Sequence, residues 1–75
     1  MAKTFSGKAV IKILCREFGF YFVSQKGSHV KLRREEASQI ITTIVPVHRE
    51  LSLGTLKGVL ELGEVDMAEF QRVAH

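Results

Sequence analysis

The chain has few of the residues that mark a secreted or membrane protein. Cys15 is the only cysteine, so no intrachain disulfide can form, and the reducing cytoplasm is the expected compartment. No apolar run approaches the roughly 20 residues that cross a bilayer. Residues 1–7 lack the hydrophobic region of a secretory signal. We therefore expect a cytoplasmic protein that does not enter a membrane.

The sequence also lacks the spacings that are typical of metal and phosphate sites. Its histidines are His29, His48 and His75, and they form no His-Glu-x-x-His pattern; with one cysteine, no Cys-x-x-Cys pattern exists either. Gly54 and Gly58 do not belong to a phosphate-binding Walker sequence. We therefore expect neither a metal ion nor an organic cofactor.

The composition indicates one small globular domain that spans residues 1–75. With 75 residues, 45% of them apolar and 25% charged, the chain can bury only a thin core. The net charge of +3 is unevenly distributed. Residues 26–34 contain no acid and residues 61–69 contain no base. The basic segment, which holds Lys26, Lys31, Arg33 and Arg34, favours a nucleic acid or an acidic protein as partner.

Helical patterns stand at both ends of the chain. Ser6 is a good N-cap for a helix over about residues 7–18, whose apolar stripe includes Cys15 as a small buried thiol, and Gly19 is a typical helix end. Further on, Ser52 can cap a helix that runs to Leu62 and ends at Gly63, and Asp66 can cap a last short helix with Met67, Phe70 and Val73 on its apolar side.

The middle of the chain is rich in aromatic and β-branched residues and predicts three strands. We expect strands over residues 20–25, 28–33 and 40–45, a tight turn at Lys26-Gly27, a connection over residues 34–38, and a stop at Pro46. Such short links favour an antiparallel meander. The expected fold class is α+β, with a three-stranded antiparallel sheet packed on helices in the order helix, three strands, helix and short C-terminal helix.

The tripeptide Gly27-Ser28-His29 is the best candidate for a functional site. Strand alternation places His29, Lys31 and Arg33 on one face, and Ser28, Val30 and Leu32 on the other. A histidine exchanges protons near pH 7, and neighbouring cations attract an anionic substrate. From these residues alone, an exposed strand histidine without a role explains the pattern equally well. His48 reads more simply as a loop residue.

These landmarks resemble the HicA family of toxins, which are small messenger-RNA interferases of toxin–antitoxin pairs. The similarity rests on the opening helix leading into Gly19-Phe20, on Gly27-Ser28-His29, and on Val45-Pro46-Val47-His48 followed by Gly54-Thr55-Leu56. The resemblance implies a fold like the double-stranded-RNA-binding domain, a catalytic role for His29, messenger RNA as substrate and a cognate HicB-type antitoxin as partner.

The resulting hypothesis is a metal-independent endoribonuclease. His29 would act in acid–base catalysis, and Lys26, Ser28, Lys31, Arg33 and His48 would contact the RNA, with His48 also a candidate for the second proton-transfer group. Two other classes of protein stay open. One is a non-catalytic RNA-binding module of the same fold, and the other is a protein-interaction domain whose basic face docks an acidic partner.

Overall fold

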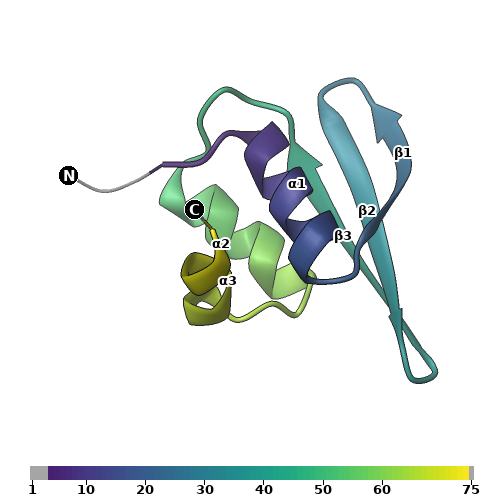
Figure 1. Cartoon of the computed structure of the whole chain (residues 1–75). Helices are drawn as coiled ribbons and strands as arrows, with labels where there is room; N and C mark the ends of the chain where they lie inside the picture. Colours follow the sequence, from purple (N-terminus) through teal and green to yellow (C-terminus); the bar gives the residue numbers. More distant parts are fainter. Residues whose placement is uncertain (1–3, 75) are drawn as a thin grey trace.

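The computed structural model describes residues 4–74, so His75 and the first three residues lie outside the described part of the chain. The elements are α1 (Gly7–Glu17), β1 (Tyr21–Lys26), β2 (His29–Glu36), β3 (Gln39–Pro46), α2 (Leu53–Leu62) and α3 (Met67–Val73) (Figure 1). This order confirms the expected α+β fold, and it is consistent with the architecture of the double-stranded-RNA-binding domain.

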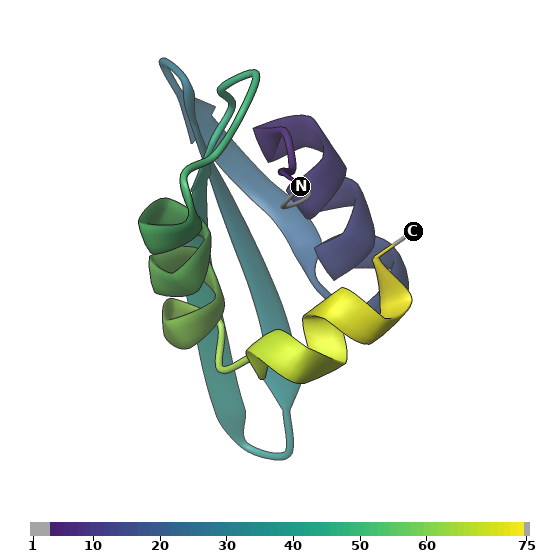
Figure 2. The same cartoon turned by 90° about the vertical axis from the view of Figure 1, so that its left-hand side faces the viewer.

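The three strands form one antiparallel sheet in the order β1-β2-β3. All three helices lie on one face of this sheet (Figures 1 and 2). The buried residues of the strands, such as Val30, Leu32 and Val45, point toward the helices. We call the opposite face of the sheet, which no described helix covers, the open face.

The helix caps lie where the sequence places them. The side chains of Ser6, Ser52 and Asp66 accept hydrogen bonds from backbone N–H groups three residues later, so each satisfies one orphan donor of a first helical turn. Gly19 follows α1 with a φ of 75°, a left-handed conformation that glycine adopts without steric cost. The predicted helices are therefore confirmed to within one residue of their ends.

The second hairpin differs from the prediction. The expected connection over residues 34–38 is wrong, because β2 continues to Glu36 and the turn consists of Ala37 and Ser38 alone. Residues 34–36 pair with Ile41, Ile40 and Gln39 of β3. The pairing of Arg34 and Glu35 with two isoleucines outweighs the low strand propensity of this segment.

The first hairpin turns one residue later than predicted. β1 runs from Tyr21 to Lys26, and the turn is Gly27-Ser28 instead of Lys26-Gly27. Gly27 has a φ of 58°, which a two-residue hairpin turn requires and glycine supplies. Ser28 therefore lies in the turn with an exposed side chain, and β2 begins at His29.

The core joins the sheet to all three helices, with Leu56, Val59 and Leu60 buried from α2. Phe70 of α3 is completely buried, with its ring 5.3 Å from that of Phe5 in an edge-to-face arrangement and 6.5 Å from that of Phe18. Cys15 is half-buried, and this burial raises the pKa of its thiol. The short C-terminal helix thus closes the aromatic part of the core.

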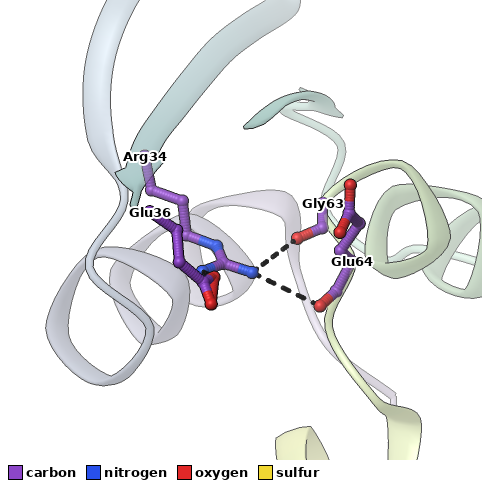
Figure 3. A network of polar contacts seen from close by, with 4 residues as sticks. All are labelled: Arg34, Glu36, Gly63 and Glu64. Atoms are coloured by element: carbon purple, nitrogen blue, oxygen red, sulfur yellow. Dashed lines mark hydrogen bonds and ion pairs between the residues drawn. The ribbon is translucent and has the colours of Figure 1, made fainter. Parts of the chain in front are cut away.

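Arg34 belongs to the basic segment of the sequence, but it does not lie on the open face. Its side chain is mostly buried on the helix side of the sheet, with the guanidinium 5.4 Å from the centre of the Phe20 ring. It forms an ion pair with Glu36, and it donates to the carbonyl oxygens of Gly63 and Glu64 over 3.4 Å each (Figure 3). Arg34 therefore ties β2 to the end of α2, which is a structural role.

Candidate functional site

Three segments meet at one end of the sheet, which we call the histidine end. They are the Gly27-Ser28 turn, the segment 47–49 after β3, and the start of α1 (Figures 1 and 2). The N–H of Val47 donates to the carbonyl of Ser28 over 2.6 Å, which extends the β2–β3 ladder by one pair beyond the strand. The N–H of Gly7 donates to the carbonyl of His48 over 2.9 Å. Backbone hydrogen bonds thus hold all three segments together.

His29 is the first residue of β2 and its side chain is exposed. Its cross-strand partners are Lys26 on β1 and Pro46 on β3. Because directly paired residues project to the same face of a sheet, the side chains of Lys26 and His29 start from neighbouring positions on one face. Within residues 4–74, the imidazole makes no hydrogen bond or ion pair.

The predicted alternation is confirmed for residues 29–33, whereas the prediction that Ser28 faces the core is wrong, because Ser28 lies in the exposed turn. Val30 and Leu32 are buried, whereas Lys31 and Arg33 are half-buried on the open face with His29. The Nε of Arg33 donates to Oγ1 of Thr42 over 3.3 Å, which directs the guanidinium across β3. A row of cations, which consists of Lys26, Lys31 and Arg33, therefore shares the open face with the exposed imidazole.

The row ends in a tyrosine–carboxylate pair that the sequence reasoning missed. The Tyr21 hydroxyl donates to Oε2 of Glu35 over 3.2 Å. Desolvation and then the Glu35 carboxylate raise the pKa of Tyr21. The alternation of β2 could have placed Glu35 on the face of His29, two residues beyond Arg33. A negative group thus bounds the cationic row on the side away from His29.

His48 belongs to the histidine end and lies on the side of α1. Its side chain is exposed and lines a cavity of about 450 Å³ with Ser6, Lys8, Val47 and Arg49. His48 stands two residues beyond Pro46, the partner of His29. The fold therefore brings the backbones of the two histidines close together from distant positions in the sequence.

Lys8 and Arg49 are further site residues that the sequence reasoning missed. Both side chains are exposed and line the cavity of His48. Arg49 could have been found from its position next to His48 in the sequence. Lys8 could not, because only the contact of α1 with the end of β3 brings it there. The positive charge at this end thus comes from three elements of the chain.

Within the part of the chain that the structure describes, no three histidine, cysteine, aspartate or glutamate side chains gather in a way that could hold a metal ion. Among the same residues, no helix has the length and apolar character that spanning a membrane would require.

Comparisons with known proteins place the chain in a family. A search of curated proteins gave no match. A family model described as "HicA toxin of bacterial toxin-antitoxin" matches residues 7–63. The match covers well over half of the chain, from the first residue of α1 to the C-cap of α2, and leaves α3 outside. Membership implies a cognate antitoxin as partner. This chain belongs to the HicA family, the toxins of bacterial toxin–antitoxin systems.

Proposed function

We propose that this toxin is a metal-independent endoribonuclease that cleaves messenger RNA in the cytoplasm, with His29 as an acid–base catalyst. The observation that carries the proposal is the position of an exposed imidazole at one end of a cationic row on the open face. RNA is a polyanion, and the row of Lys26, Lys31 and Arg33 attracts its phosphates. No described element walls off the imidazole, so an extended strand can reach it.

The reaction uses the RNA's own 2′-hydroxyl as nucleophile. A neutral His29 imidazole takes the proton of the 2′-hydroxyl, the 2′-oxygen bonds to the adjacent phosphorus, and the bond from phosphorus to the 5′-oxygen breaks. An acid gives a proton to the leaving 5′-oxygen, so the products carry a 2′,3′-cyclic phosphate and a 5′-hydroxyl. The cationic row stabilises the charge that develops on the phosphate oxygens.

His48 is the proposed source of the second proton. It stands at the same end of the sheet as His29, and Lys8 and Arg49 line its cavity. These two cations attract the phosphate whose leaving 5′-oxygen receives the proton. Ser28 contributes its carbonyl to the bond with Val47, which positions the loop of His48, and its exposed hydroxyl is available to the RNA.

A non-catalytic RNA-binding module is the second candidate function. The observation in its favour is that no carboxylate or carbonyl within residues 4–74 bonds to the His29 ring and fixes its orientation. In that case His29 would contact a phosphate or a 2′-hydroxyl without moving a proton. In both cases a HicB-type antitoxin would neutralise the toxin, either by covering His29 or by occupying the cationic row.

The experiment that tests the proposal analyses the ends of the RNA products. The purified toxin is incubated in EDTA with labelled RNA, and with the same RNA carrying a 2′-deoxynucleotide at the cleaved position. We expect cleavage of the all-RNA substrate into fragments with cyclic phosphate ends, and none at the deoxynucleotide. RNA that is bound but intact would favour the binding module. Cleavage that persists at the deoxynucleotide would refute the 2′-hydroxyl mechanism.

A further inference from the structure

Helix α1 carries a row of cations of which only Lys8 belongs to the site described above. Lys8, Lys12 and Arg16 follow one another at intervals of four residues and therefore lie on one side of the helix. All three are exposed, whereas Val10 and Leu14 are completely buried on the other side. We call Lys8, Lys12 and Arg16 the α1 basic stripe.

Helix stability explains only Arg16 in this stripe, because Arg16 stands in the last turn, where the helix dipole favours a cation. Like charges four residues apart destabilise a helix, and Lys8 stands in the first turn, where the helix dipole also disfavours a cation. The first turn holds no acid, and the one ion pair of the stripe joins Arg16 to Glu17 over 3.0 Å. A polyanion bound along the helix would offset this repulsion.

The stripe begins at the histidine end. Lys8 lines the cavity of His48, and the neighbouring Val47 is bonded to Ser28, which directly precedes His29. From Lys8 to Arg16 the helix rises about 12 Å, because each residue adds about 1.5 Å. This length corresponds to about three or four stacked nucleotides of one strand at roughly 3.4 Å each.

We propose that the α1 basic stripe binds the sugar–phosphate backbone of the RNA on one side of the cleaved bond. The inference rests on the proposed function, since it takes RNA to be the substrate at His29. One part of the strand follows the open face along Lys31 and Arg33, and the other passes His48 and follows α1. Contacts of this kind hold phosphates and carry no sequence information, so they position the RNA without selecting its sequence.

The chemistry of the helix surface favours a nucleic acid over a protein as occupant. Protein interfaces are built around buried aromatic or aliphatic anchors. The exposed large hydrophobic residues within 4–74 all lie on the strands or on α2, and none lies on α1. They are Tyr21, Phe22, Ile40, Leu53 and Leu62. The α1 basic stripe therefore offers a ligand cationic groups and no apolar anchor.

The test compares two double variants of equal charge. Lys12→Gln/Arg16→Gln removes two cations from α1, and Lys57→Gln/Arg72→Gln removes two exposed cations from α2 and α3. The pairs match closely, because Arg16 and Arg72 each lose one exposed ion pair to a neighbouring glutamate. Lys8 is left in place because it lines the cavity of His48.

Binding of single-stranded RNA is measured against salt concentration, in a His29→Ala background that keeps the RNA intact. Each lost phosphate contact lowers the slope of log K against log salt by about 0.7. We therefore expect the α1 variant to lose about 1.4 from the slope and the control variant to lose almost nothing. Equal slopes for the two variants would overturn the proposal, and so would an α1 variant that has weakened only its binding to the antitoxin.

A second readout separates this proposal from the proposed function. With His29 intact, we expect the α1 variant to need more RNA for half-maximal cleavage and to reach the control's rate at saturation. Full cleavage with an unchanged salt slope would overturn the proposal for the α1 basic stripe and leave the catalytic proposal standing. A toxin that binds RNA with the expected slopes but never cleaves it would overturn the catalytic proposal and support the stripe.

Discussion

Replacing Gly7 by alanine should destabilise the protein, although the same substitution stabilises most helices by about 0.8–1.0 kcal/mol. Gly7 is the first residue of α1 and is buried against the end of β3. An added Cβ would lie 2.0 Å from the carbonyl oxygen of Pro46 and 2.9 Å from the Cα of Val47. Both are backbone atoms and cannot rotate away. Overpacking of this kind typically costs about 1–3 kcal/mol, so after the propensity gain we expect a net loss of up to about 2 kcal/mol.

Gly58→Ala is the matched control, since a Cβ at this position in α2 would meet nothing within 4 Å. It should stabilise the protein by up to about 1 kcal/mol. With a urea m-value of about 1 kcal/mol/M for a small domain, the unfolding midpoint should fall by up to about 2 M for Gly7→Ala and rise by up to about 1 M for Gly58→Ala. A midpoint that rises for both variants would refute the close contact of α1 with β3. Because the N–H of Gly7 bonds to His48, Gly7→Ala should also slow RNA cleavage.

Two further stability predictions concern the end of the chain. Phe70→Ala should lower the free energy of unfolding in urea by about 3–5 kcal/mol, because it empties a completely buried aromatic site. Phe22→Ala, at a side chain that is 57% exposed, should lower it by about 0.5 kcal/mol or less. Similar losses for the two variants would show that α3 does not close the core. Glu64→Gly should raise the melting temperature by a few degrees, because Glu64 has a φ of 55°, which glycine adopts without strain. A lower melting temperature would contradict the left-handed conformation at the end of α2.

The parts of the fold that depend on neighbours in the sequence could be predicted. The caps at Ser6, Ser52 and Asp66 need only a hydroxyl or carboxylate before an apolar periodic segment. The end of β2 could not be predicted, since Arg34-Glu35-Glu36 has the composition of a loop. Those residues are strand because β3 pairs with them, and Arg34 turns inward because it contacts Phe20 and the carbonyls at the end of α2.

The candidate site also has one part that could be predicted from neighbours in the sequence and one part that could not. Alternation along one strand predicts that His29, Lys31 and Arg33 share a face, and the structure confirms it. Lys26 joins them through the register of the first hairpin. That His48 lines a cavity with Lys8 could not be predicted, because this contact requires α1 to pack on the end of β3. The catalytic role of His29 stays a prediction.

The most direct test of that role is the rate of RNA cleavage at saturating toxin, measured for the unchanged chain and for His29→Ala. Loss of general acid–base catalysis costs about 10²–10⁴-fold in rate. We expect at least this loss in His29→Ala. The RNA affinity should be nearly unchanged, because the cationic row stays in place. The urea midpoint should also be nearly unchanged, because the side chain is exposed and makes no bond within residues 4–74. Cleavage by His29→Ala at the rate of the unchanged toxin would contradict the account.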